Sequence, residues 1–258
     1  MNVITYSAAI SACEKGQQWQ LALALLLEMA LVKVDKNVFT YSAAISACAK
    51  GKAWQLALGL LAEMALVKVE KDVKTYSASI SACEKGQQWQ LALGLLAEMF
   101  FVKVDRNVVT YSAAVGACEK GHQWQLALGL LAEMAFVKVD KNAITYSAAI
   151  SACEKGQQWQ LALQLLAEMA FVKVDKDVIA YSAAISACEK GQQWQLALGL
   201  LAEMALVKAD KDVITYNAAM SASEKGQQWE LALGLLAEMA LVKVRKNVVT
   251  YSAAISAY

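Results

Sequence analysis

Near the start of the chain, apolar side chains recur at the spacing i, i+3, i+4 and i+7. They are Tyr6, Ala9, Ile10 and Cys13. This spacing places all four on one face of an α-helix. Gly16 follows, at the position where glycine commonly ends a helix. The pattern therefore predicts a first helix that ends at Gly16.

A second apolar run with the same helical spacing follows directly. Its members are Trp19, Ala22, Leu23 and Leu26. The run predicts a second helix that continues to about Leu31. The more polar segment 32–37 then connects this helix to the next copy of the pattern. Two helices joined by so short a turn form a helical hairpin.

The hairpin pattern recurs every 35 residues, as the step from Trp19 to Trp54 illustrates. The complete repeats are 3–37, 38–72, 73–107, 108–142, 143–177, 178–212 and 213–247, and a partial eighth covers 248–258. A repeat of this length buries its apolar face only by stacking on its neighbours. We therefore predict an all-α fold: a right-handed α-solenoid superhelix of helix-turn-helix hairpins, with residues 1–258 forming a single repeat array.

The composition is apolar, with 58% hydrophobic residues and a mean hydropathy of +0.37. Apolar stretches such as 21–27 are nonetheless cut by charges such as Glu28, whereas a membrane-spanning helix needs about 20 apolar residues. Helices buried on two sides in a stack explain the excess better, so we expect no membrane partner. The net charge of +1 gives no overall attraction to nucleic acid, so an electrostatic role needs charges gathered on one surface.

Cysteine and histidine usage argues against catalysis and metal binding. The cysteines follow the repeat period, at Cys13, Cys48, Cys83, Cys118, Cys153 and Cys188. Stacked helices lie about 8–10 Å apart and a disulfide spans at most about 7 Å, so we expect small buried thiols. The single histidine, His122, falls in a turn, and no Cys/His cluster, phosphate loop or serine-nucleophile motif occurs. We expect no enzymatic activity, metal, cofactor or small-molecule substrate.

Particular residues of the repeat carry a family resemblance. They are Thr-Tyr-Ser at 5–7, Ala22, and Glu-Met at 28–29 near the end of the second helix. With the 35-residue length, this combination resembles the pentatricopeptide repeat, and the resemblance covers essentially the whole chain. The tetratricopeptide repeat fits less well, because its tryptophan lies in the first helix and a proline closes it. One departure from the family is that the connection 32–37 lacks the usual glycine and proline.

The resemblance implies that the partner is single-stranded RNA, and that one repeat reads one base with two or three side chains. The specifying pair is the fifth and the last residue of each repeat. The fifth residues are Ser7, Ser42, Ser77, Ser112, Ser147, Ser182, Asn217 and Ser252. The last residues are Asn37, Asp72, Asn107, Asn142, Asp177, Asp212 and Asn247.

The family's rule assigns adenine to Ser with Asn, guanine to Ser with Asp, and a pyrimidine to Asn with Asn. The repeats then spell 5′-AGAAGGY-3′, with the N-terminus at the 5′ end. The chemistry agrees, because an ionised Asp only accepts hydrogen bonds and the Watson–Crick edge of guanine is rich in donors. The alternative is that Asn and Asp are nearly equivalent helix N-caps and exchange neutrally. The two interpretations are not exclusive.

Two further rows acquire roles from the resemblance. The second residue of each repeat sandwiches the base, and it is apolar at Ile4, Phe39, Val109, Ile144, Ile179, Ile214 and Val249 but is a lysine at Lys74. A lysine near the end of each first helix approaches the RNA phosphates: Lys15, Lys50, Lys85, Lys120, Lys155, Lys190 and Lys225. The alternatives are core packing for the first row and a favourable helix-dipole contact for the second. Lys33 and Lys36 in the connection are expected to be solvated.

The resemblance thus implies sequence-selective binding of single-stranded RNA. Such a protein acts by occupancy in RNA processing, stabilisation or translation, in a chloroplast or mitochondrion. An alternative from another class is a protein–protein interaction scaffold, and the similarity of the repeats also fits a recently duplicated or designed array. No polar capping repeat is visible at either end, so self-association through the ends is a further expectation.

Overall fold

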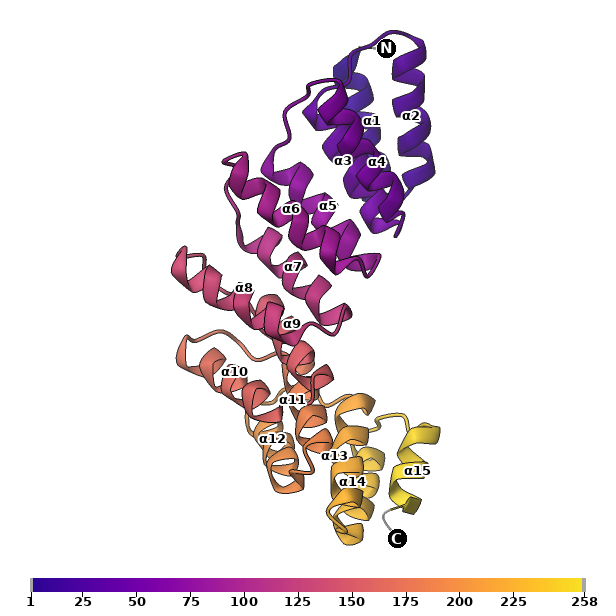
Figure 1. Cartoon of the computed structure of the whole chain (residues 1–258). Coiled ribbons are helices and arrows are strands. Elements are labelled where there is room, and N and C mark those ends of the chain that lie inside the picture. Colours follow the sequence, from indigo (N-terminus) through magenta and orange to yellow (C-terminus); the bar gives the residue numbers. More distant parts are fainter. Residues whose placement is uncertain (1, 257–258) are drawn as a thin grey trace. The chain divides into compact units, whose positions relative to one another are not determined.

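The computed structural model describes residues 2–256, and over that range it contains fifteen α-helices and no strands (Figure 1). The first helices of the hairpins are α1 (Val3–Lys15), α3 (Val38–Lys50), α5 (Val73–Lys85), α7 (Val108–Lys120), α9 (Ala143–Lys155), α11 (Val178–Lys190), α13 (Val213–Lys225) and α15 (Val248–Ser256). The second helices are α2 (Trp19–Leu31), α4 (Trp54–Leu66), α6 (Trp89–Phe101), α8 (Trp124–Phe136), α10 (Trp159–Phe171), α12 (Trp194–Leu206) and α14 (Trp229–Leu241). The predicted all-α fold of repeated hairpins is confirmed; the last two residues of the partial eighth repeat lie outside the described range.

The chain divides into two compact units. The first comprises Met1–Gly121 and Ala132–Asp140, and the second comprises His122–Leu131 and Lys141–Tyr258. Within the first unit, α1, α3, α5 and α7 pack successively against one another, and each second helix packs against the first helix of the next hairpin. The second unit repeats this order from α9 to α15. Each unit is therefore an α-solenoid of stacked hairpins (Figure 1).

The core of each unit is formed by one apolar stripe from each helix. In the second repeat, Tyr41, Ile45 and Cys48 of α3 and Ala57 and Met64 of α4 are fully buried. Burying a side chain of the size of isoleucine or methionine contributes about 1.5–3 kcal/mol. Alanines on the same faces let the helices approach closely, so the apolar composition is used inside the stack.

The predicted small buried thiols are present, and all six cysteines are free. Burial raises the pKa of five of these thiols to about 11, at Cys48, Cys83, Cys118, Cys153 and Cys188. A thiol with so high a pKa is almost fully protonated near neutral pH and is a poor nucleophile. Over residues 2–256, no group of three or more His, Cys, Asp or Glu side chains is placed to hold a metal ion. None of the helices in that range has the length and apolar character required to cross a bilayer.

The first helix of each hairpin ends where predicted, but the glycine there has a different role. Gly51 has φ −80°, and it is the following Lys52, at φ 59°, that adopts the left-handed conformation. A Cβ atom on Gly51 would overlap the indole ring of Trp19 from the preceding hairpin. Gly191 stands in the same relation to Trp159. The glycine is therefore needed for close packing between hairpins and not for its own backbone conformation.

The connection between hairpins forms without glycine or proline. Lys33 takes the left-handed conformation at φ 56°, and the backbone N–H of Val34 donates to the carbonyl of Met29 at 2.9 Å. A non-glycine residue in this region costs roughly 1–2 kcal/mol, so other contacts must hold the connection in place.

A partly buried ionic contact supplies that restraint, and it corrects the expectation that Lys36 is solvated. The Lys36 ammonium forms an ion pair with Glu63 Oε1 at 2.6 Å and lies 5.6 Å from the centre of the Tyr41 ring. The Tyr41 hydroxyl donates to the same Glu63 oxygen at 2.7 Å. We call this set of three residues the clamp. It joins the connection to both helices of the next hairpin.

The clamp recurs at six connections. Its members are Lys36–Tyr41–Glu63, Lys71–Tyr76–Glu98, Arg106–Tyr111–Glu133, Lys141–Tyr146–Glu168, Lys176–Tyr181–Glu203 and Lys211–Tyr216–Glu238. Burial alone would raise the pKa of the Glu63 carboxyl, but hydrogen bonds from Lys36 and Tyr41 lower that pKa below its ordinary value. Burial and the bond to Glu63 raise the pKa of Tyr41. The clamp therefore favours a charged glutamate beside a neutral tyrosine.

Candidate nucleic-acid interface

The last residue of each repeat caps the first helix of the next hairpin. The Asn37 Oδ1 atom accepts the backbone N–H of Thr40 at 3.0 Å, and the Asp72 Oδ1 atom accepts that of Thr75 at 2.8 Å. Equivalent caps are made by Asn107, Asn142, Asp177, Asp212 and Asn247. Such a bond satisfies one of the free N–H groups at the helix start. The capping interpretation is confirmed.

Capping determines which polar group of this residue remains for a ligand. Both Asn37 and Asp72 use one side-chain oxygen for the helix. What remains on the Asn37 side chain is the amide NH₂, a donor, and what remains on Asp72 is the second carboxylate oxygen, an acceptor. Exchange of Asn for Asp therefore preserves the cap and reverses the hydrogen-bonding character of the exposed group.

The fifth residues lie beside these caps, and they differ in exposure. Ser42, Ser147 and Ser182 are buried, Ser7, Ser77, Ser112 and Asn217 are half-buried, and Ser252 is exposed. In the fifth and seventh repeats the fifth residue contacts the last directly. The Ser147 hydroxyl donates to Asp177 Oδ1 at 2.9 Å, and the Asn217 amide donates to Asn247 Oδ1 at 3.2 Å. The structure thus brings together the two residues that the resemblance pairs.

In other repeats the serine hydroxyl bonds elsewhere. Ser7 and Ser77 donate to the carbonyls of Val3 and Val73 in their own helices. Ser42 donates to the Phe39 carbonyl at 3.3 Å. Since these hydroxyls are already engaged, the last residue of the repeat presents the freer polar group.

The substitution of alanine for the usual threonine at Ala180 has a local consequence. Thr75 donates its hydroxyl to Asp72, and Thr215 donates to Asp212, each at no more than 2.7 Å. Ala180 has no hydroxyl, and the corresponding Asp177 accepts the hydroxyl of Ser147 instead. At Asp177 the fifth residue thus contributes the hydroxyl contact that the threonine contributes at Asp72 and Asp212.

The second residues form a row that is open to solvent. Their relative exposures run from 53% to 74%: Ile4, Phe39, Val109, Ile144, Ile179, Ile214 and Val249. Lys74, in the same row, is also exposed. Core packing, the alternative interpretation for this row, is wrong. Large apolar side chains exposed at a constant spacing are suited to packing against flat ligand groups.

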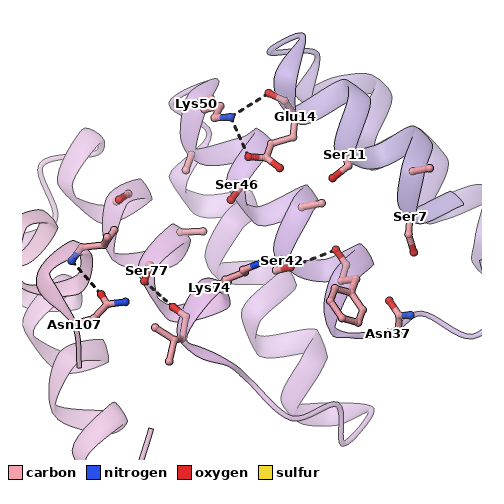
Figure 2. A pocket seen from close by; sticks show the side chains of 18 of the residues that line it. Ser7, Ser11, Glu14, Asn37, Ser42, Ser46, Lys50, Lys74, Ser77 and Asn107 are labelled. Atoms are coloured by element: carbon pink, nitrogen blue, oxygen red, sulfur yellow. Dashed lines mark hydrogen bonds and ion pairs between the residues drawn. The ribbon is translucent and has the colours of Figure 1, made fainter. Parts of the chain in front are cut away.

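In the first unit these rows line one groove of about 990 Å³. Ser7, Ser42 and Ser77 face it from successive first helices, as Figure 2 shows. Asn37 and Asn107 lie at one end of the helices and Lys50 and Lys85 at the other. The groove thus combines capping side chains, an apolar row and cations.

Most of the predicted phosphate-contacting lysines are paired with glutamates. Each pairs with a glutamate of the preceding hairpin, and the pairs are Lys50–Glu14 at 2.9 Å, Lys120–Glu84 at 2.7 Å, Lys190–Glu154 at 2.5 Å and Lys225–Glu189 at 2.5 Å. We call this series the Glu–Lys ladder; its first pair is drawn in Figure 2. Sequence reasoning missed it, although the recurrence of a glutamate 36 residues before each of these lysines is the signal.

The ladder has an interruption in the second repeat. Ala49 occupies the position held by Glu14, Glu84 and Glu154 in other hairpins. No glutamate therefore stands opposite Lys85. The lysines of this row therefore differ: Lys50 is paired with a ladder glutamate, and Lys85 has none opposite it.

The fold and the groove define a class: a helical-repeat protein with a polar, partly apolar groove on its first helices. A profile described as the pentatricopeptide repeat domain matches residues 1–51, 59–120 and 199–258, and a second, the PPR repeat, matches 39–66 and 144–170. The first alone covers more than half of the chain. The chain belongs to the pentatricopeptide repeat family.

Solved structures show the same fold. The pentatricopeptide repeat protein PPR10 from maize aligns with a TM-score of 0.59 and 19% identity, over 100% of this chain and 47% of that one. PPR10 in complex with an 18-nt psaJ RNA element aligns with 0.55 and 16%, over 100% and 48%. The PPR domain of Arabidopsis thaliana protein-only RNase P 1 in complex with tRNA aligns with 0.62 and 14%, over 69% and 94%. This chain spans about half the length of the maize protein. No curated protein sequence matches it.

Proposed function

We propose that the chain binds single-stranded RNA with sequence selectivity, one base per repeat, and that its preferred target is 5′-AGAAGGY-3′. The observation that carries this proposal is the state of the capping residues. Asn37, which lines the groove, keeps an amide donor free of the cap, and Asp72 in the equivalent position of the next repeat keeps a carboxylate oxygen, while both make the same cap. Complexes of family members with RNA support the choice of ligand.

The donor–acceptor difference matches the two purines. The Watson–Crick edge of adenine carries an acceptor at N1, which the Asn37 amide can donate to. The same edge of guanine carries N–H donors at N1 and N2, which the free Asp72 carboxylate oxygen can accept. A base-reading contact of this kind is worth about 1–3 kcal/mol of discrimination. Adenine is therefore assigned to repeats 1, 3 and 4, and guanine to repeats 2, 5 and 6.

The seventh repeat has a different pair. Asn217 donates to Asn247 Oδ1 and, through its own Oδ1, accepts the hydroxyl of Thr250 at 2.7 Å. We assign a pyrimidine to this repeat, as the family's rule for Asn with Asn gives.

The exposed row of second residues supplies the flat contacts. Phe39 offers an aromatic face, and stacking of a base on an aromatic side chain contributes about 1–3 kcal/mol. Ile4 and Val109 offer smaller aliphatic surfaces. If bases and these side chains alternate along the groove, the bound RNA strand is extended, with one base at each successive repeat.

Binding of this kind acts by occupancy. A covered RNA segment is shielded from nucleases and cannot form an inhibitory hairpin, which places the protein in RNA processing, stabilisation or translation. Chloroplasts and mitochondria are the compartments that the family suggests. The function is binding and not catalysis, because the proposal uses no reactive side chain.

The test compares 5′-AGAAGGU-3′ with 5′-GAGGAAU-3′, in which every adenine and guanine is exchanged. The two strands have equal length and charge, so fluorescence anisotropy at one salt concentration isolates base reading. We expect the first to bind at least about a hundredfold more tightly, which is the sum of two modest base contacts. Equal affinities would overturn the code, and no binding of either would favour a protein-interaction scaffold.

A further inference from the structure

The interruption of the Glu–Lys ladder coincides with other departures from the repeat. In the second repeat, Ala49 replaces glutamate and Lys52 replaces the glutamine found at Gln17 and Gln87. In the third repeat, Lys74 replaces an apolar residue. All three changes make the junction of these two hairpins more positive.

Two of the three changed residues, Ala49 and Lys74, lie at the groove. Ala49, Lys74 and Lys85 all line it, and Lys74 extends from α5 toward Ser42 of α3 (Figure 2). Lys74 and Lys85 stand at opposite ends of the same helix. Cations therefore flank the positions at which the proposed bases of the second and third repeats would sit.

The surroundings of Lys85 favour an anion. Burial lowers the pKa of Lys85; Glu84 partly offsets this, and the positive charges of Lys120, Lys50 and Lys52 lower it further. Lys50 and Lys120 are each held by a glutamate of the ladder, at 2.9 Å and 2.7 Å. Lys85 faces Ala49 where those lysines face a carboxylate. An anion bound at Lys85 relieves repulsion among cations without displacing an ion pair.

We propose that this gap in the ladder is an anchoring site for a backbone phosphate of the bound strand, centred on Lys85. The proposal rests on the function proposed above and adds that the phosphate contacts are unequal. A ladder lysine must give up its glutamate before it binds a phosphate, whereas Lys85 has Ala49 at the position of the ladder glutamate. The site recognises the phosphodiester group and is indifferent to the base.

The test restores the missing glutamate of the ladder. Ala49→Glu introduces a glutamate at a position where Glu14, Glu84 and Glu154 are accommodated in other hairpins. Lys85→Gln removes the cation, and the double variant A49E/K85Q separates a specific Glu–Lys pairing from a general effect of added negative charge. Glu154→Ala is the matched control, because it opens an equivalent gap opposite Lys190 in the second unit.

Binding is measured against 5′-AGAAGGU-3′, against its base-exchanged counterpart, and against inorganic polyphosphate, which has no bases. One phosphate contact to a single strand contributes a slope of about −0.7 in log affinity against log salt, or about fivefold between 1 M and 0.1 M. We expect A49E and K85Q each to weaken binding of all three probes about fivefold at 0.1 M salt. The double variant should be no weaker than either, and E154A should bind about fivefold more tightly.

The outcomes separate the two proposals. Additive losses in A49E and K85Q, or equal losses from K85Q and from Lys120→Gln, would overturn the anchor whether or not the bases are discriminated. Non-additive losses with equal binding of the two heptamers would support the anchor and overturn the base code. Circular dichroism melting of each variant provides the check that the hairpins remain folded.

Discussion

Ionic contacts between hairpins occur in two regions: the clamps at the connections and the Glu–Lys ladder at the C-terminal ends of the first helices. At the connections, the cation of each clamp has a side-chain exposure of 14–17% and contacts both a glutamate and a tyrosine. At the ends of the first helices, the ladder lysines have side-chain exposures of 32–41% and pair with a glutamate. Each of the six clamps keeps a cation, a tyrosine and a glutamate, with Arg106 as the cation in one of them. The ladder, by contrast, is interrupted at Ala49. The clamp therefore joins the connection to the next hairpin through a shielded cation, and the ladder links successive first helices through a more exposed one.

The largest expected effect comes from breaking the clamp. Glu203→Ala leaves Lys176 and the Tyr181 hydroxyl without their acceptor in a half-buried setting. We expect a loss of about 1–3 kcal/mol in the free energy of unfolding. The matched ladder variant Glu189→Ala removes an exposed pair with Lys225 and should cost at most about 1 kcal/mol. Urea unfolding followed by circular dichroism measures both, and equal losses would contradict the distinction between the clamps and the ladder.

A change in the groove should alter recognition and leave stability intact. Asn37→Asp keeps an N-cap of nearly equal quality, but it replaces an amide donor by a carboxylate acceptor. We expect the preference at the first base to move from adenine to guanine by about tenfold, within the range of a single base contact. Anisotropy with heptamers that differ only in that base gives the result. A change in melting temperature without a change in base preference would mean that the residue is only a cap.

Acid should act on the clamps. The pKa values of Glu63, Glu98, Glu168, Glu203 and Glu238 are lowered in the folded chain by their lysine and tyrosine partners. The stability that they contribute is therefore present above the unfolded value of about 4.3 and is lost as pH falls through the folded values. We expect the urea midpoint to decrease below about pH 4.3, and less steeply in Glu203→Ala. An unchanged slope in that variant would contradict this origin.

Alkali should also destabilise the clamps, in this case through ionisation of their tyrosines. Burial and the bond to Glu133 raise the pKa of Tyr111 to about 12, and Tyr41, Tyr76, Tyr146, Tyr181 and Tyr216 are raised likewise. A raised pKa stabilises the fold below the unfolded value of about 10, and this contribution is lost as pH rises through the folded value. Absorbance at the tyrosinate band should show these six ionising only together with unfolding. Their ionisation near pH 10 in the folded protein would contradict the clamp.

The smallest expected effect concerns Ala180. Ala180→Thr restores a hydroxyl that should displace Ser147 from Asp177, as Thr215 contacts Asp212. We expect a stability change within about 0.5 kcal/mol and a modest change in guanine affinity at the fifth repeat. Binding of heptamers that vary only at the fifth base tests this, with the sixth base as the internal control.

The sequence predicted the helices closely because the apolar spacing is local. The boundaries of the first hairpin, Val3–Lys15 and Trp19–Leu31, agree with the pattern. The role of Gly51 was missed, because its contact with Trp19 crosses between hairpins. The sequence alone predicts a solvated Lys36 for the same reason, since its partner Glu63 lies 27 residues away in the next hairpin.

The candidate site could be predicted only as rows of positions. Periodicity identified which residues share a row, and the exposure of Phe39 and Ile144 agrees with a ligand-facing role. The periodicity does not predict the hydrogen-bond or ion-pair partner of each side chain. The pairing of Ser147 with Asp177, and the absence of a glutamate opposite Lys85, follow from contacts between neighbouring hairpins.

The contact of tryptophan with glycine has a consequence for how such a chain changes its length. Trp19 lies against Gly51 as Trp159 lies against Gly191, so the junctions are interchangeable. Removing any 35 consecutive residues from the interior, whatever the starting point, brings a tryptophan of one hairpin against the glycine of another and leaves the frame of the stack intact. The same holds for insertion. A gene of this kind can gain or lose whole repeats by simple recombination. Under the proposed code, each event would lengthen or shorten the bound RNA sequence by one nucleotide.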